Sequence, residues 1–394
     1  MDSRSVLLTW LVSGTLLPSA IVSCLAIYVL RAAAPKLGLM DHPDPRKVHV
    51  RAVPLGGGIG IWLGVIVPFA IGQLILSRLE QGQTELFGVL IPPSIAEHLS
   101  GIRERANSLW AILGAGTFFM ALGLADDRFG LPWQARLASQ FAVAALCVVW
   151  QGWQLTAFVM LPYVALALSI VWIVGMINSF NMLDNMDGLS SGVALIASAS
   201  LAAVALTSDE PGNEGPQLFV GGFLLVLVGA LAGFLWHNRP PAKIFMGDAG
   251  SYFVGFCVSV ATLLATYTSY VSPKPHAILA PLVVMAVPLY DMTSVIWIRL
   301  RAGSSPFKAD KNHLSHRLVE LGMNKTIAVL TIYLLTAICG LSALLLQQVD
   351  ALGAVVILLI VGSVLLLVAL LEMAARRKER HRLRAESSSP TVQK

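Results

Sequence analysis

The sequence contains few charged residues. Only 12% of its 394 residues are Asp, Glu, Lys or Arg, about half the share of an ordinary soluble domain. Hydrophobic residues make up 56%, and the mean hydropathy is +0.74. This scarcity of charge excludes a water-soluble globule. Basic residues outnumber acidic ones, 27 against 22, and both lie in short breaks between apolar runs. That pattern indicates membrane orientation and no nucleic-acid binding.

Cysteine is also scarce, and its placement argues against two kinds of site. The four cysteines each lie within an apolar run, with no CxxC pair and no histidine at ligand spacing: Cys24, Cys147, Cys257 and Cys339. Neither a disulfide framework nor a zinc site is indicated. The first apolar run begins by residue 6 and is too long for the core of a signal peptide, so we expect it to be a helix of the protein.

Long apolar runs are abundant. Eleven of them approach the ~20 residues that cross a bilayer core about 30 Å thick. The predicted spans are 6–31, 55–77, 108–125, 133–151, 158–177, 188–207, 217–236, 249–271, 276–298, 325–346 and 351–372. Transmembrane strands would be alternating segments of about half this length. The expected fold class is therefore all-α: a polytopic membrane protein with about 11 transmembrane helices in one domain over 1–375.

The basic residues predict the orientation. With the N-terminus outside, 22 of the 27 lie on the inner side and 5 lie outside, namely Arg4, Arg78, Arg103, Arg105 and Lys274. The C-terminus is then cytoplasmic. Residues 376–394 are basic and poor in hydrophobic residues, so we expect a disordered cytoplasmic tail that lies on anionic lipid or binds a partner.

Six aspartates lie at span ends that this topology places on the inner side: Asp126, Asp127, Asp184, Asp187, Asp248 and Asp291. Helix capping or a turn could explain Asp127, Asp187 and Asp248 one at a time. Neither explanation covers Asp126, Asp184 and Asp291, and placing a carboxylate in hydrocarbon costs a few kcal/mol. Four segments that are distant in sequence thus bring carboxylates to one membrane face, as a cation site between helices requires.

Asn178, Asn181, Asp184 and Asp187 recur every three residues. A regular helix would spread these groups over about half its surface, whereas a 3₁₀ turn would align them. Either arrangement makes a polar wall at the membrane boundary. Magnesium is the natural ion, because it takes one or two carboxylates and completes its octahedron with water and phosphate.

Cationic groups flank the carboxylates. The loop after the first span carries Arg46, Lys47, His49 and Arg51, and the loop after the ninth carries Lys308, Lys311, His313, His316 and Arg317. Orientation alone could account for the basic residues but requires no histidine. A cationic rim around an acidic site suits a polyanion such as a nucleoside diphosphate. Three glycines at 56–58 have no strand before them, so they indicate close packing of the second helix and not a phosphate loop.

Five ordered motifs between residues 41 and 318 carry a resemblance: DHPDPRKVHVRAVPLGGG, LGLADDRFG, NSFNMLDNMDGLSSG, KIFMGDAGS and SPFKADKNHLSHRL. The chain resembles the polyprenyl-phosphate N-acetylhexosamine-1-phosphate transferases. The resemblance implies a plasma (inner) membrane enzyme with its active site facing the cytoplasm. It implies transfer of a sugar-1-phosphate from a UDP-N-acetylhexosamine to a polyprenyl phosphate, dependent on Mg²⁺, or alternatively Mn²⁺. A homodimer is left open.

The same resemblance implies roles for individual residues. Asp126, Asp127, Asp184, Asp187, His313 and His316 are the implied catalytic residues, and Asp248 and Asp127 the implied metal ligands. The implied substrate contacts are Asn181, Asn238 and Phe245, with Phe245 stacking on uracil. Lys47, His49, Arg51 and Arg317 are expected to contact substrate as members of the cationic rim. Two positions depart from the family pattern: Asn185 replaces a glycine, and Ser315 replaces a histidine.

Three other activities compete with this interpretation. The phospho-MurNAc-pentapeptide translocase belongs to the same family, but SPFKADKNHLSHRL is closer to the N-acetylglucosamine branch. A transporter of lipid-linked sugars would place its ionisable residues near the midplane, often between inverted repeats, and the sequence shows neither feature. A CDP-alcohol phosphotransferase would carry a single DGxxAR-like run, which is absent from the sequence.

Overall fold

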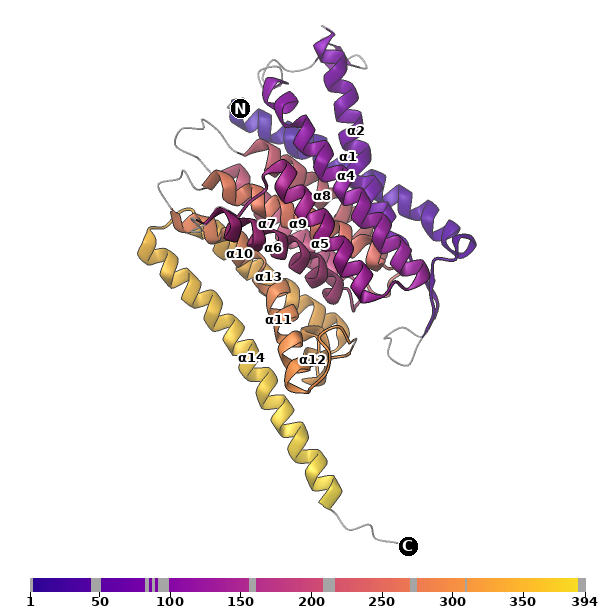
Figure 1. Cartoon of the computed structure of the whole chain (residues 1–394), viewed down its shortest axis with the longest axis vertical. Coiled ribbons are helices and arrows are strands. Elements are labelled where there is room, and N and C mark those ends of the chain that lie inside the picture. Colours follow the sequence, from indigo (N-terminus) through magenta and orange to yellow (C-terminus); the bar gives the residue numbers. More distant parts are fainter. Residues whose placement is uncertain are drawn as a thin grey trace.

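The computed structural model describes residues 3–43, 51–81, 85–86, 89–90, 99–155, 161–207, 217–269, 275–308 and 310–388. In this part the chain is helical apart from two short antiparallel hairpins (Figure 1). The all-α prediction is therefore confirmed. Helices follow the apolar runs because, in hydrocarbon, each backbone polar group has to find its partner within its own segment.

The long helices are α1 (Ser3–Leu37), α2 (Gly57–Glu80), α4 (Leu99–Phe129), α5 (Trp133–Gln151), α6 (Pro162–Leu183), α7 (Leu189–Thr207), α8 (Leu218–Asn238), α9 (Gly247–Ser269), α11 (Ala286–Arg301), α13 (Lys325–Leu346) and α14 (Ala351–Ser388). The short ones are η1 (Pro275–Leu279), α10 (Ala280–Val284) and α12 (Leu314–Glu320). Strand β1 (Met40–Asp41) pairs with β2 (Val53–Pro54), and β3 (Glu85–Leu86) pairs with β4 (Val89–Leu90).

Within the described residues, nine helices are long and apolar enough to cross a membrane, or ten if a bent pair forms one span. The bent pair covers the ninth predicted span, 276–298, and turns by 62° between α10 and α11. The predicted span is therefore helical but is not one continuous helix. Pro288 has no N–H to donate to the carbonyl of Val284, which is where α10 ends. Helix α5 forms over the fourth predicted span without being among those nine.

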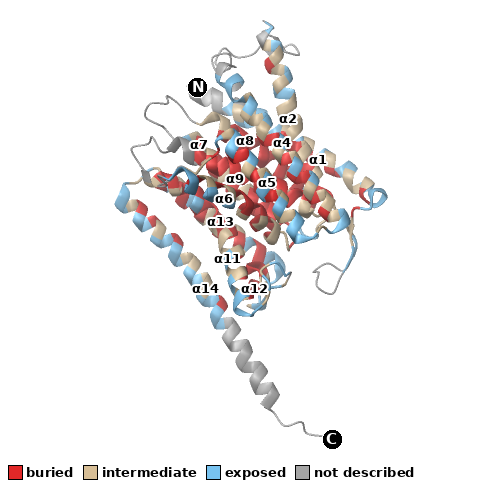
Figure 2. Ribbon diagram, viewed as in Figure 1, coloured by how far each residue is buried: buried red, intermediate tan, exposed pale blue. Residues whose placement is uncertain are grey.

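The core of the bundle is built around α8 and α9, the most deeply buried of these spans. Helix α1 packs on α8 and on α2. Helices α4 and α6 both pack on α9, and helix α7 packs on α8 and on α13. Figure 2 shows the buried residues gathered at the centre of the bundle, whereas α14 is exposed along much of its described surface. Exposed apolar residues on α1 and α14 are those that a membrane would cover.

Helix α14 runs to Ser388, so it takes in much of the segment from Arg376 that composition predicts to be disordered. The structure has a helical backbone there instead. Residues 374–385 are mainly Ala, Arg, Lys, Glu and Leu, which favour helix. Extending an existing helix also avoids the cost of a new nucleus.

The glycines at 56–58 bring α2 against the start of α9, which confirms their predicted packing role. Gly57 N donates to Phe245 O and Gly58 N to Met246 O, each at 3.0 Å. A Cβ on Gly58 would collide with the backbone of Gly250. On the other side, a Cβ on Gly123 of α4 would collide with the backbone of Asp248. The backbones of α2, α4 and α9 therefore touch at one end of the bundle.

Candidate active site

The N-terminus of α9 is capped by Asp127 from α4. Its Oδ1 accepts from the backbone N–H of Asp248 at 2.9 Å, and its Oδ2 from that of Ala249 at 3.1 Å. A carboxylate is stabilised there by the free N–H groups and by the positive end of the helix dipole. Gly247, at φ +69°, makes the approach possible, since a Cβ would lie 2.5 Å from Asp127 Oδ2. The cap joins two residues predicted to hold metal.

Asp126, the other member of the acidic pair, is buried and fully paired. Its Oδ1 accepts from Leu131 N at 2.8 Å, and its Oδ2 accepts from Arg136 Nη1 at 2.5 Å and from Tyr252 Oη at 3.0 Å. Arg136 Nη1 also lies 3.8 Å from Asp248 Oδ2. Arg136 is not among the residues that the sequence predicts for the site. The available signal was a basic residue inside a predicted span, where a charge needs a partner.

Helix α6 brings its polar residues to two neighbours. Asn181 Nδ2 donates to Asp248 Oδ1 at 2.6 Å and to Ser251 Oγ at 3.1 Å on α9. Asn178 Nδ2 donates to Gln140 Oε1 of α5 at 2.6 Å. Asn178 and Asn181 thus lie on a regular helix, but the helix ends at Leu183, so neither predicted arrangement extends over all four polar residues.

Asp184 and Asp187 lie in the turn between α6 and α7. Burial, together with the negative charges of Asp127 and Asp187, raises the pKa of Asp184 to about 7. The carboxylates from α4 and from this turn therefore interact, as the predicted convergence requires. Asp187 Oδ2 accepts from Ala242 N at 2.9 Å, which ties the turn to the segment after α8.

The donor set at this end of the bundle consists of carboxylates, which suit a hard divalent cation. In the part of the chain that the structure describes, no three His, Cys, Asp or Glu side chains form a preformed metal cluster. A magnesium site needs fewer, because water and substrate phosphate supply the remaining ligands. Asp248 Oδ2 lies 3.8 Å from Arg136 Nη1, which is too far for a hydrogen bond to that group.

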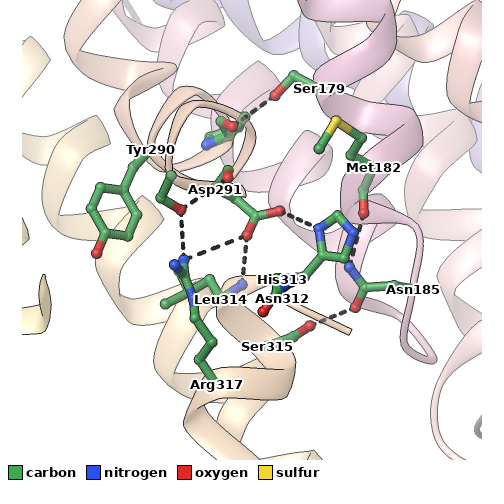
Figure 3. Close-up of polar contacts among 12 residues, drawn as sticks. Ser179, Met182, Asn185, Tyr290, Asp291, Asn312, His313, Leu314, Ser315 and Arg317 are labelled. Carbon is green, nitrogen blue, oxygen red and sulfur yellow. Dashed lines mark hydrogen bonds and ion pairs between the residues drawn. The ribbon is translucent and has the colours of Figure 1, made fainter. Parts of the chain in front are cut away.

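A second polar cluster lies where α11 meets α12 (Figure 3). Asp291 Oδ2 lies 3.0 Å from His313 Nδ1, and its Oδ1 accepts from Leu314 N at 2.5 Å. Burial, with the charges of His313 and Lys311, lowers the pKa of His316. Asp291 is one of the six predicted aspartates, but its pairing with His313 is not evident from the sequence.

Arg317 belongs to this buried cluster and is only 3% exposed. Its Nη2 donates to Ser294 Oγ at 2.7 Å, and its Nη1 lies 3.4 Å from Glu372 Oε2 on α14. Arg317 thus joins α11, α12 and α14, because a buried guanidinium needs these acceptors, and its role as a substrate contact stays a prediction.

The two positions that depart from the family pattern contact each other. Ser315 Oγ donates to Asn185 Oδ1 at 2.5 Å, and Asn185 Nδ2 donates to Met182 O at 2.9 Å (Figure 3). This contact joins α12, which follows His313, to the turn that carries Asp184 and Asp187.

The remaining predicted substrate contacts are placed differently. Asn238 is buried; its Oδ1 accepts from Gly188 N at 2.9 Å, and its Nδ2 donates to Ile244 O at 2.8 Å, so the side chain joins α7 to α8. Phe245 is partly exposed beside Gly247, and Arg51 is exposed next to β2. Lys47 and His49 lie outside the described residues.

Comparison with known proteins decides the family. The model of glycosyl transferase family 4 matches residues 109–266, which extend from within α4 to within α9 and include five of the six aspartates. The chain is also 31% identical to the "Probable undecaprenyl-phosphate N-acetylglucosaminyl 1-phosphate transferase" of Bacillus subtilis (strain 168), over 83% of this chain and 84% of that protein. This chain belongs to glycosyl transferase family 4.

Two further relatives place the chain within family 4. The decaprenyl-phosphate N-acetylglucosaminephosphotransferase of Mycolicibacterium smegmatis is 32% identical, over 83% of this chain and 80% of that protein. The undecaprenyl-phosphate alpha-N-acetylglucosaminyl 1-phosphate transferase of Escherichia coli (strain K12) is 29% identical, over 83% and 82%. The resemblance stated from the five motifs is thereby confirmed.

Proposed function

We propose that this chain transfers N-acetylglucosamine-1-phosphate from a UDP-sugar to a polyprenyl phosphate such as undecaprenyl phosphate, releases UMP and starts a lipid-linked cell-envelope glycan. The observation that carries the proposal is the convergence of Asp126, Asp127, Asp184 and Asp248 at one end of a membrane bundle. Relatives named for this reaction align with four-fifths of the chain.

The transfer depends more on positioning the two substrates than on activating the attacking oxygen. A phosphate oxygen of the lipid attacks the phosphorus that carries the sugar, the bond to the UMP phosphate breaks, and UMP leaves with the electron pair. The lipid phosphate is already an anion near neutral pH, so its oxygen needs no strong base. Phosphoryl transfer is accelerated mainly by alignment and by stabilisation of the phosphate charge. One pyrophosphate linkage replaces another, which makes the reaction nearly isoenergetic and reversible by UMP.

We assign metal binding to Asp248 and Asp127, with Mg²⁺ as the ion and Mn²⁺ as a substitute. Asp184 supports this assignment: burial, together with the negative charges of Asp127 and Asp187, raises its pKa to about 7, and a divalent cation would offset those charges. When bound, the ion neutralises charge on the diphosphate. Asp184 and Asp187 line the same region, Phe245 is assigned to the uracil ring, and Lys47, His49 and Arg51 to the substrate phosphates.

We also propose that the bundle spans the plasma membrane eleven times, with the N-terminus outside and the aspartates facing the cytoplasm. The distribution of basic residues supports this orientation. Facing the cytoplasm gives the site access to a nucleotide sugar, which is too polar to enter the bilayer.

The test is a reaction with purified protein in detergent. Undecaprenyl phosphate and magnesium are supplied with UDP-N-acetylglucosamine, UDP-N-acetylgalactosamine or UDP-MurNAc-pentapeptide, and the lipid product and UMP are measured by mass spectrometry. We expect a lipid pyrophosphoryl sugar and equimolar UMP with UDP-N-acetylglucosamine, and none with Asp248→Asn. A product from the pentapeptide substrate alone would identify a translocase, and no lipid product from any donor would refute the proposal.

A further inference from the structure

Asp291 is a buried carboxylate whose two oxygens face different donors. It lies within α11 and is 1% exposed. Oδ2 lies 3.0 Å from His313 Nδ1, whereas Oδ1 accepts from Leu314 N and lies 3.8 Å from Arg317 Nη2. Burying a carboxylate is expensive unless it is paired and hydrogen-bonded, and here both oxygens meet donors of α12 or its N-cap.

The contact with Asp291 determines which nitrogen of His313 carries the hydrogen. An ionised carboxylate only accepts hydrogen bonds, so the hydrogen of the neutral ring lies on Nδ1. Nε2 is then left with its lone pair and can accept a proton or a hydrogen bond. A carboxylate behind an imidazole fixes the ring orientation in the same way at metal sites and in catalytic triads.

The far edge of the ring points toward the turn of the proposed active site. In Figure 3 the His313 imidazole lies between the Asp291 carboxylate and the turn that carries Asn185. The hydrogen bond from Ser315 Oγ to Asn185 Oδ1 shows that this end of α12 touches that turn. His313 is therefore held at its Nδ1 side by α11, while its helix is held against the segment of Asp184 and Asp187.

Arg317 holds the carboxylate itself in place. Its Nη2 donates to Ser294 Oγ at 2.7 Å, one helical turn after Asp291 on α11, and its guanidinium lies 3.4 Å from Glu372 of α14. Tyr290 Oη donates to the same Glu372 oxygen at 3.1 Å. The cluster surrounds Asp291 with fixed groups, so its oxygen toward His313 has little freedom to turn away.

We propose that Asp291 is a positioning residue for His313: it holds the ring as the Nδ1–H tautomer, so that Nε2 presents an acceptor to the substrates at the turn of Asp184 and Asp187. The proposal deepens the transferase function proposed above and rests on it. Asp291 itself touches no substrate and acts through the histidine.

The decisive measurement is the tautomer of His313, which does not depend on turnover. Protein labelled with ¹⁵N-histidine, compared with His313→Gln to assign the signal, should show an Nδ1–H ring for His313. Asp291→Asn keeps the size of the side chain but offers an N–H₂ group to Nδ1, so the hydrogen should move to Nε2. An Nε2–H ring in the unaltered protein would overturn the proposal, even if Asp291→Asn fails to fold.

Kinetics supply the second readout. Asp291→Asn should lower kcat by at least about 100-fold, as loss of a correctly protonated acid–base group does, with little change in the KM of the UDP-sugar. In the His313→Gln background the same substitution should cause no further loss, because Asp291 acts only through His313. A further loss in that background would indicate a structural role and refute the proposal.

Thr293→Val is the matched control. It removes an exposed hydroxyl from the same helix, where Thr293 Oγ1 donates to the backbone carbonyls of Leu289 and Tyr290, so the ¹⁵N spectrum and kcat should stay as in the unaltered protein. A change of tautomer in Thr293→Val would contradict a specific role for Asp291. If the tautomer switches with Asp291→Asn but no UDP-sugar supports turnover, the pairing stands and the proposed transferase function fails.

Discussion

The carboxylate of Asp127 accepts the backbone N–H of Asp248, so one predicted metal ligand holds the helix that carries the other. This contact makes the acidic pair of α4 and the first turn of α9 a single structural unit. It also gives Asp127 two roles, a helix cap and a source of charge, which substitutions can separate.

Asp127→Asn should keep one hydrogen bond of the cap and lose the other together with the charge. The amide oxygen can accept from one N–H, but the NH₂ group offers no acceptor to the second, so the free energy of unfolding should fall by about 1–3 kcal/mol. Turnover should fall by at least about 100-fold, the low end for loss of a positioned electrostatic or acid–base group. Thermal unfolding and steady-state kinetics measure the two effects. Turnover that stays within a few-fold of the unaltered protein would remove Asp127 from the catalytic set.

Gly123→Ala should disturb the site from a distance. The added methyl group would collide with the backbone of Asp248, and forcing an atom into a packed contact costs about 1–3 kcal/mol. We expect lower thermal stability and lower kcat together. Gly114→Ala on the same helix is the control, since a Cβ there meets nothing within 4 Å. Equal effects of the two substitutions would show that helix propensity matters and the contact with α9 does not.

Arg136→Gln should weaken the site by leaving the aspartates without their cation. Asp126 would keep the hydroxyl of Tyr252 but lose its charged partner. We expect kcat to fall at least about tenfold, equivalent to about 1.4 kcal/mol, and Arg136→Lys to restore part of it. Arg128→Gln is the control: it removes an exposed arginine from the end of α4 that carries Asp126, and it should have little effect on kcat. Full activity in Arg136→Gln would show that Arg136 is only a packing residue.

The raised pKa of Asp184 predicts that the free energy of unfolding depends on pH in metal-free buffer. Burial raises its pKa to about 7 from the ordinary 3.8, so the folded protein binds this proton more tightly than the unfolded chain. The free energy of unfolding should therefore fall as pH rises from about 4 to about 7. Thermal unfolding in a chelator measures this slope, and Asp184→Asn should reduce it.

Asp310 supplies the control for this slope. Although burial acts in the opposite sense, hydrogen bonds from Arg299 and Asn312 lower the pKa of Asp310 to about 2. Its contribution to stability is complete above pH 4 and is lost only as pH falls toward 2. Asp310→Asn should thus leave the slope between pH 4.5 and 8 unchanged. An unchanged slope in Asp184→Asn would contradict the assignment to Asp184.

The proposed orientation predicts the location of the loops. Single cysteines placed at Ser304 and at Gly212, in a chain whose native cysteines are replaced, should differ in labelling by a membrane-impermeant maleimide. Position 212 should react in intact cells, and position 304 only after the membrane is opened. Labelling of position 304 from outside would reverse the topology.

Most of the fold follows from the sequence, because the length of an apolar run is sufficient to specify a membrane helix. The convergence of Asp127, Asp184 and Asp248 also followed, since helix ends on one membrane face are few and close together. The break between α10 and α11 was missed because the run of apolar residues hides the effect of Pro288.

The roles of Asn238, Asp291 and Arg317 could not be predicted, because they depend on which side chains meet across the bundle. Asn238 and Arg317 have the polarity of ligand-binding residues, yet the structure places them where buried backbone and carboxylate groups need partners. The partner of Asp291 lies 22 positions away across a loop, a separation that no periodicity encodes.

The glycine contacts of α9 make that half of the site more rigid than the half formed by α11 and α12. At Gly58 and Gly123 the backbones of α2 and α4 touch that of α9, which leaves Asp248 no room to shift. Helix α12, by contrast, reaches the turn of Asp184 through a side-chain hydrogen bond between Ser315 and Asn185, which can break and re-form. A displacement between the two halves of the site should therefore occur where α12 meets this turn, and not at the backbone contacts that hold α9.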